Sequence, residues 1–328
     1  MANKPVYALL ILSILTCVFQ AGSEIITLQK VLDNVQEHNL ELHMLAGEIK
    51  ASGELTRQAH ALPNPELEGE VEGVTAEEIA VFVKQTFELG GKRKNRIRLA
   101  GHAEKKAQFS HEERVLALKA EAIRRYLPLP ALKAKLLMLD SLLANAQAIA
   151  DAIKRRVEAG ASRRIDLVRA RMTVKELVLD KKQIKHQFRQ KIAHLYALWS
   201  ANPPENAGVS EMLNTSLQLP ERELYRASVQ SLPAMRMLRL AQTLKQTELQ
   251  QARSEIRPDL VLSAGYKRNN AAGEHAPVIG VGMDVPLFNQ NKGTQAALRH
   301  EQALLDLQLK QSLSGIHAHL EQVRLRIE

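Results

Sequence analysis

Four glutamates alternate with apolar or small residues in the segment ELEGEVE, residues 66–72. Successive side chains of a β-strand point to opposite faces, so the four carboxylates are expected on one face, opposite Leu67 and Val71. The glutamates are Glu66, Glu68, Glu70 and Glu72. A row of carboxylates can attract cations along a surface, but it can also be no more than a hydrated face. Both interpretations stay open.

A second candidate is Gly90-Gly91-Lys92, which resembles the end of a phosphate-binding loop. Such a loop needs a glycine at the position of Thr86 and a Ser or Thr at the position of Arg93. Both are absent. We therefore interpret the two glycines as the turn from a strand into a helix.

The 11 histidines could suggest a metal site. None is followed four residues later by another, the spacing that puts two imidazoles on one helix face. His317 and His319 are only two residues apart, and His275 lies in an expected turn. We therefore expect no catalytic residue, no cofactor and no metal site, and we do not interpret the chain as an enzyme.

The composition favours helices over a thick globular core. The chain has 328 residues, with 45 Lys and Arg against 36 Asp and Glu, a formal charge of +9. The two signs are interleaved, which is typical of solvated helix faces rather than of a nucleic-acid-binding patch. Aromatic residues make up only 4%, whereas good helix formers are abundant.

Residues 1–23 are typical of a secretory signal peptide. Lys4 precedes an apolar run too short to span a bilayer, and Ala21 and Ser23 have the spacing of a cleavage site. Cleavage would remove Cys17, the sole cysteine, and with it all thiol chemistry. A lipid anchor at Cys17 is an open alternative. No later segment has the long uncharged run of a transmembrane helix.

The rest of the chain contains two similar series of elements. The first repeat, residues 24–204, begins with a helical pattern and continues with a β-hairpin at 65–89. A helical pattern then runs from Lys92 to Ala159, with apolar residues every three and four positions, as in helices that wind around neighbours. A compact core has no use for so long a helix.

The second repeat, residues 205–328, begins within the linker SANPPENAG. Its β-hairpin at 258–287 also begins beside a proline, and the start of a long helix follows. By comparison with the first repeat, about 70 residues are lacking at the end, so we expect an incomplete copy.

The stretch RRVEAGASRRIDLVRA, residues 155–170, separates two long helical patterns. Gly160 can take the left-handed conformation that ends a helix. Ser162 is expected to cap the next helix, and Asp166 lies near its positive end. The stretch therefore predicts the tip of a helical hairpin.

Several segments together resemble the outer-membrane efflux factor (TolC-like) family over nearly the whole chain after residue 23, as a C-terminally truncated member. RVEAGASRRIDLVRA is similar to the family's tip, where a glycine precedes a small residue and an Asp-Leu pair. FELGGKRKNRI, residues 87–97, resembles the cation-efflux branch of the cobalt-zinc-cadmium type. RPDLVLSAGY and GVGMDVPLFNQNKG resemble the family's second-hairpin strands.

The resemblance implies a mainly α fold with a small β part, in which long coiled-coil helical hairpins join four transmembrane-barrel strands per protomer. It implies a homotrimer in the outer membrane, in contact with outer-membrane lipid and with a periplasmic helical extension. Further partners would be a periplasmic membrane-fusion adaptor and an inner-membrane pump of the RND type; no nucleic acid is expected. The strand count agrees, because four strands cannot close a barrel and open edges are not viable in lipid.

The resemblance also assigns roles to two sets of residues. The four glutamates of the row would line the pore. The tip would contact the adaptor through Gly160, Ala161, Ser162, Arg163, Arg164 and Asp166.

We predict the outer-membrane component of a tripartite efflux system, a passive export duct for heavy-metal cations. Alternatives are drug or protein (type I) export through the same architecture, or a periplasmic coiled-coil scaffold without a pore. Pro128 and Pro130 depart from the family pattern, because each removes a backbone donor from a helix. We expect a break or kink there.

Overall fold

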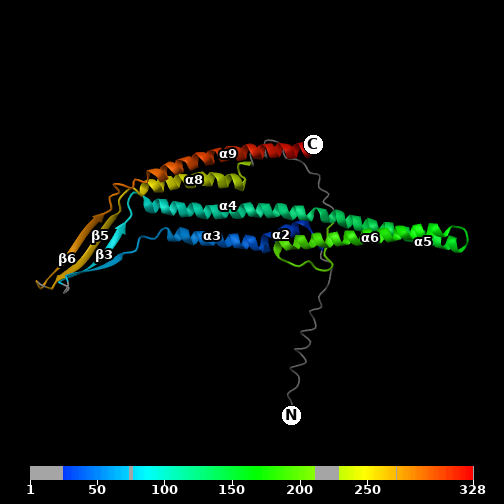
Figure 1. Ribbon diagram of the computed structural model, residues 1–328, viewed down its shortest axis with the longest axis horizontal. Helices are drawn as coiled ribbons and strands as arrows, with labels where there is room; N and C mark the ends of the chain where they lie inside the picture. The colour runs from blue at the N-terminus through cyan, green and yellow to red at the C-terminus, as the bar shows by residue number, and fades with distance from the viewer. Residues whose placement is uncertain (1–24, 74–76, 211–228, 271, 328) are drawn as a thin grey trace, which may run out of the picture. The chain divides into compact units, whose positions relative to one another are not determined.

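The computed structural model describes residues 25–73, 77–210, 229–270 and 272–327 (Figure 1). The expected signal peptide at 1–23, with Cys17, lies outside these residues. By spatial contact the chain divides into two compact units. One comprises Met1–Leu40 and Leu116–Ser216, and the other comprises Glu41–Val115 and Leu217–Glu328.

The first unit is built around one helical hairpin, in which α5 and α6 pack side by side (Figure 1). A short parallel pair of strands, β1 with β4, and the helices α2 and η1 complete the unit. Its elements are β1 (Ile25–Ile26), α2 (Leu28–His38), the last part of α4 (Lys92–Tyr126), α5 (Pro128–Glu158), α6 (Arg164–Tyr196), η1 (Ala197–Trp199) and β4 (Gly208–Val209). The strand pair was not predicted, because two residues are too few to show an alternating pattern.

The core of this unit combines α2, the two short strands, the start of α5 and the end of α6. Its largest fully buried side chains are Ile26, Val31, Val35, Leu129, Leu195 and Val209. The Tyr126 hydroxyl donates a hydrogen bond to the Ile26 carbonyl at 3.3 Å. Burial raises the pKa of Tyr126, which keeps its hydroxyl protonated as a donor.

The predicted break at the two prolines is confirmed. Helix α4 ends at Tyr126 and α5 begins at Pro128. The Leu127 N–H still bonds the Ile123 carbonyl at 2.9 Å, whereas Pro128 has no N–H to continue the series. Pro130 is buried, so the break is packed into the core of the first unit rather than left in solvent.

The described helical stretch Lys92–Glu158 contains one segment that is long and apolar enough to cross a membrane, by length and composition alone. The expectation that no segment after residue 23 passes this test is therefore wrong by length and composition. In the structure α5, the second helix of this stretch, packs along α6.

The second unit contains one antiparallel sheet and the helices that lead into it and out of it. Its elements are α3 (Leu40–Gln58), β2 (Glu66–Glu72), β3 (Glu78–Phe87), the first part of α4, α8 (Pro233–Ser254), β5 (Leu260–Asn269), β6 (Glu274–Met283) and α9 (Lys292–Ile327). Helices α8 and α9 pack side by side. Lys245 links them, with Nζ 2.8 Å from Glu248 and 2.9 Å from Glu301, and these hydrogen bonds raise the pKa of Lys245.

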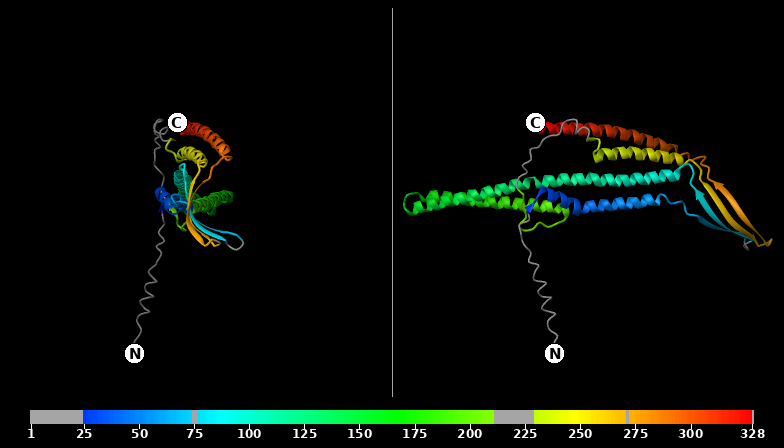
Figure 2. Two further views of the ribbon diagram at one scale, coloured as in Figure 1. Left: turned by 90° about the vertical axis from the view of Figure 1, so that its left-hand side faces the viewer. Right: turned by 180° about the vertical axis from the view of Figure 1, so that it is seen from behind.

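The sheet has the strand order β2-β3-β5-β6, with every neighbouring pair antiparallel. It lies at one end of α3, α8 and α9 (Figure 1), and Figure 2 shows the four strands curving together. The two hairpins join through β3 and β5, where Val81 is opposite Tyr266. Strands β2 and β6 are the edges of this sheet.

The predicted fold class, mainly helical with a small four-stranded part, is confirmed. The strands lie inside the predicted hairpin ranges 65–89 and 258–287. The two compact units group residues by contact, whereas the predicted repeats 24–204 and 205–328 group them by sequence. The repeat boundaries therefore stay a prediction.

Candidate functional site: a two-faced sheet, its elbow and a hairpin tip

One face of the sheet is an exposed apolar surface. The strand register places the odd-numbered residues of β2 and β3 on the same face as the even-numbered residues of β5 and the odd-numbered residues of β6. Its exposed apolar members are Leu67, Val71, Ile79, Val81, Val83, Phe87, Leu262, Tyr266, Ile279, Val281 and Met283. Ile279 is 84% exposed and Leu67 is 77% exposed. Arg268 and His275 share this face beside the turn between β5 and β6, and its apolar remainder is suited to lipid rather than to water.

The opposite face carries the predicted row of glutamates and further charged side chains, together with small and apolar ones. The register places Glu66, Glu68, Glu70 and Glu72 of edge strand β2 on this face, opposite Lys84, Phe82, Ala80 and Glu78 of β3. Lys84 forms an ion pair with Glu68. Lys267 of β5 forms an ion pair with Glu78, and Asn269 donates a hydrogen bond to Glu78 at 3.0 Å. The row is therefore an acidic face that is partly neutralised by two lysines.

Sequence reasoning missed Glu78, Lys84 and Lys267 as members of this face. Their positions alternate with the apolar residues of the same strands, so the parity of β3 was a signal for Glu78 and Lys84. Lys267 carried no such signal, because its place opposite Ala80 depends on the register between two hairpins.

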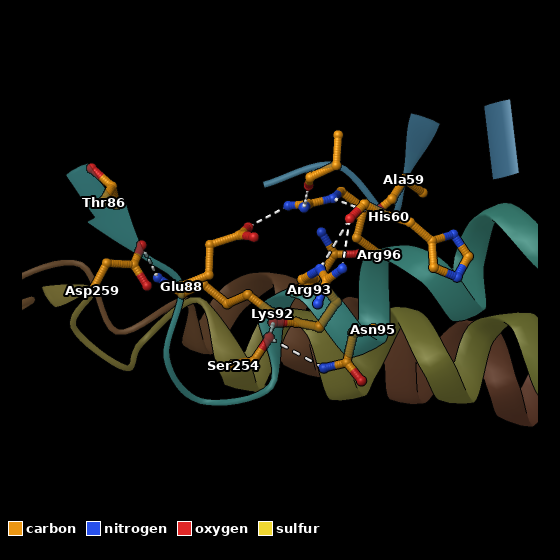
Figure 3. Close-up of polar contacts among 12 residues, drawn as sticks. Ala59, His60, Thr86, Glu88, Lys92, Arg93, Asn95, Arg96, Ser254 and Asp259 are labelled. Carbon is orange, nitrogen blue, oxygen red and sulfur yellow. Dashed lines mark hydrogen bonds and ion pairs between the residues drawn. The ribbon is translucent and has the colours of Figure 1, made fainter. Parts of the chain in front are cut away.

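The turn from β3 into α4 is an elbow held by ion pairs (Figure 3). Lys92 Nζ lies 2.8 Å from Asp259 Oδ2, and Asp259 also accepts from the Leu89 N–H at 3.0 Å. Arg96 pairs with Glu88 and also donates to the Ala61 carbonyl at 2.9 Å. The side chain of Lys92 therefore pairs with the Asp259 carboxylate, beside the start of the second hairpin.

Both glycines of the elbow have left-handed backbone conformations, with φ of +71° at Gly90 and +84° at Gly91. Their interpretation as the turn from strand to helix is confirmed. The side-chain stem of Arg257 lies against Gly90, where an added Cβ would be 2.5 Å from its Cδ and 2.8 Å from its Cβ. Gly91 has nothing within 4 Å of such a Cβ.

The tip residues form a turn between α5 and α6 in the first unit. Gly160 has φ of +73°, as predicted. The Gly160 N–H bonds the Val157 carbonyl at 3.0 Å and the Ala161 N–H bonds the Arg156 carbonyl at 2.7 Å, which together close the end of α5. No atom lies within 4 Å of a Cβ added at Gly160, so the turn is open to its surroundings.

The predicted cap at Ser162 is wrong. Helix α6 begins at Arg164, and its N-cap residue is Arg163, which makes no side-chain cap hydrogen bond. The Arg163 carbonyl accepts from the Asp166 N–H at 3.1 Å, and Asp166 also lies 3.8 Å from the Arg163 guanidinium. The helix therefore starts one residue later than Ser162 would require, and Asp166 provides the negative charge in its first turn.

The described part of the chain shows no group of three His, Cys, Asp or Glu side chains placed to hold a metal ion. The features that stand out are the two faces of the sheet and the open turn. The model of the family "Outer membrane efflux protein" matches residues 31–201. The chain belongs to this family.

Two curated relatives of this outer membrane efflux protein come from Cupriavidus metallidurans. The chain described here is 26% identical over 292 residues to the cobalt-zinc-cadmium resistance protein CzcC, and the match covers 88% of this chain and 70% of CzcC. It is 26% identical over 273 residues to the nickel and cobalt resistance protein CnrC, covering 80% of the chain and 65% of that protein.

Solved channel structures share the fold of this outer membrane efflux protein. Crystal structures of CusC superpose with a TM-score of 0.70 at 17% identity, covering 88% of the chain and 72% of CusC. The outer membrane protein VceC of Vibrio cholerae superposes with a TM-score of 0.67 at 16% identity, and the match covers 91% of this chain and 78% of VceC. The protein is a transport component of the outer membrane with a periplasmic helical extension, in a family that is not one of enzymes.

Proposed function

We propose that this outer membrane efflux protein is the export duct of a tripartite system for heavy-metal cations. The observation that carries the proposal is the four-stranded sheet with one exposed apolar face and one acidic face. The apolar face suits the hydrocarbon of a bilayer, and the acidic face suits a water-filled passage for cations. Two relatives are named for resistance to cobalt, zinc, cadmium and nickel, which supports metal cations as the cargo.

A homotrimer is the assembly that satisfies the edges of this sheet. Strands β2 and β6 each have one side without a neighbouring strand among the described residues. Unpaired backbone groups are not tolerated in hydrocarbon, and four strands are too few to close a barrel. Three copies would supply twelve strands in one closed barrel. The scaffold alternative offers no use for the exposed apolar face.

The acidic face would concentrate cations by its charge rather than by tight binding. A conduit needs sites weak enough to release its cargo. Carboxylates spread along a strand meet this need, because no three of them gather as metal ligands in the described residues. The two lysines on the same face would limit the effect, since each is paired with a glutamate.

The double variant Glu68→Gln and Glu70→Gln tests this wall. We expect cation over anion permeability to fall by about two- to fivefold, because two of the carboxylates per chain are neutralised and Lys84 is left unpaired. The measurement is the reversal potential of the purified trimer in planar bilayers, under gradients of KCl and of CoCl₂.

The matched control is Lys84→Gln, which removes a positive charge from the same face. It should shift the reversal potential in the opposite direction, toward greater cation preference. If both variants leave the preference of the unmodified protein unchanged, the face is only a hydrated wall and the charge-based proposal fails.

The tip would dock a periplasmic adaptor protein. Nothing lies within 4 Å of a Cβ added at Gly160, which would let a second helical hairpin approach the backbone closely there. Ala161 and Ser162 are small, and Arg163 and Arg164 add positive charge beside Asp166. The adaptor in turn would connect the duct to an inner-membrane pump, for which the RND type is our proposal.

Replacing Gly160 with Leu should abolish this docking. Any side chain at φ of +73° costs about 1–2 kcal/mol, and Leu adds bulk where the partner must approach. Gly160→Ala is the control, because it carries the same backbone cost with little bulk. Crosslinking to the cognate adaptor in cells should be lost with Leu and largely retained with Ala. Retention with both would contradict contact at the tip.

A further inference from the structure

The positive charge of the protein is concentrated in the first unit. Its described residues, 25–40 and 116–210, contain 19 Lys and Arg against ten Asp and Glu. Within it, the segment of α6 from Lys181 to His194 contains no Asp or Glu at all. Its cationic residues are Lys181, Lys182, Lys185, Arg189 and Lys191. None of these side chains belongs to the row of glutamates or to the tip.

This acid-free segment borders a groove of about 670 Å³ within the first unit. Its lining comes from α5, from α6 and from the segment 203–207 that follows η1. Apolar side chains line part of it, namely Leu136, Phe188, Ile192, Pro203, Pro204 and Ala207. Lys181, Lys185 and Arg189 add positive charge at a spacing of four residues, which places them along one side of α6. The groove is therefore amphipathic, with an apolar part and a cationic edge.

The groove does not neutralise its own cations. Lys181 forms an ion pair with Asp140 across the hairpin. Lys185 and Arg189 make no ion pair with any described residue, and both are exposed. Glu205 is the remaining acid of the lining, and it lies beyond ion-pair distance of either. Two cations beside an apolar surface thus remain available to a partner.

We propose that this groove binds an acidic, amphipathic segment of a partner protein. Its carboxylates would pair with Lys185 and Arg189, and its apolar side chains would enter between Phe188 and the two prolines. Charge complementarity selects an acidic partner, because like charges at the groove edge would repel a basic one. The apolar lining selects a segment with hydrophobic side chains rather than a merely anionic polymer. No residue of this groove belongs to the sheet or to the tip, and the proposal does not depend on the proposed cargo.

The test uses the full chain, purified as the detergent-solubilised protein, and three fluorescein-labelled peptides. The peptides alternate Glu with Leu, Glu with Ser, or Lys with Leu. Fluorescence anisotropy should detect binding of the Glu-Leu peptide, with an affinity that falls as salt is added. The double variant Lys185→Gln and Arg189→Gln should weaken that binding about tenfold, because two ion pairs are lost. Glu205→Gln should strengthen it.

The matched control is Arg169→Gln with Arg171→Gln, two exposed cations of the same helix outside the groove. It removes the same charge and should leave the affinity within about twofold. Equal weakening by the control, equal binding of the Glu-Ser peptide, or binding of the Lys-Leu peptide would each overturn the proposal. Trimer content and bilayer conductance are measured on the same preparations. Both should be unchanged in all variants, so that failure here is distinguishable from failure of the duct.

Discussion

Replacing Ile279 with Lys is expected to destabilise the membrane-inserted protein by about 2–4 kcal/mol. Ile279 lies near the middle of β6, its side chain is 84% exposed, and it belongs to the apolar face of the sheet. A charged group on the lipid face of a barrel strand must leave water for hydrocarbon or pull water in after it. The measurement is the urea midpoint of protein folded into phospholipid vesicles, followed by heat-modifiable gel migration.

Val278→Lys is the matched control, because the neighbouring residue points to the other face of the same strand. Val278 lies opposite Gly265 on the polar face, where a lysine would be hydrated. We expect a loss below about 1 kcal/mol there. Equal losses for the two substitutions, or a larger loss for Val278→Lys, would show that the apolar face does not meet lipid.

Gly90→Ala is expected to be the most disruptive single change at the elbow, with a loss of about 2–3 kcal/mol. Two costs add together. An alanine at φ of +71° is strained, and its Cβ would meet the Arg257 stem at 2.5 Å. The ion pairs of Lys92 and Arg96 then have to be kept on a displaced backbone. Urea unfolding followed by far-ultraviolet circular dichroism measures the effect.

Gly91→Ala separates the two costs. Gly91 has φ of +84° but nothing within 4 Å of an added Cβ, so we expect only the backbone cost of about 1–2 kcal/mol. Combining Gly90→Ala with Arg257→Ala should recover the difference between the two variants, because the clash is removed. A double variant no more stable than Gly90→Ala alone would place the damage elsewhere than at Arg257.

The local elements of the fold could be predicted from the sequence because each has a short-range physical cause. Alternating residues in β3 placed Val81 and Val83 on one face, and the strand register agrees. Pro128 removed a donor, and the helix breaks there. Gly160 ended α5 in the left-handed conformation. The individual strands, the break and the tip are all set by patterns within a few residues.

Two of the contacts that were missed join distant segments, and one missed feature is local. The ion pair of Lys267 with Glu78 follows from the register between the two hairpins, which local alternation does not determine. The link from Lys92 to Asp259 joins residues 167 positions apart. The local feature is the start of α6. The helix begins at Arg164 with Arg163 as its N-cap, and the presence of Ser162 one residue earlier does not make it the cap.

Because the row of glutamates lies on the edge strand β2, it affects which strand edges can pair when copies of the chain assemble. If the β2 strands of two copies paired with each other, their two rows of carboxylates would lie side by side on one face of the sheet. Like charges at neighbouring positions repel. Strand β6 instead offers mostly small or apolar neighbours on the same face, among them Ala276, Val278, Gly280 and Gly282. Head-to-tail joining of unlike edges is thus favoured over self-pairing of identical ones. Electrostatic repulsion between copies would then disfavour the β2–β2 pairing, so that the oligomers that form are those that can close into a ring.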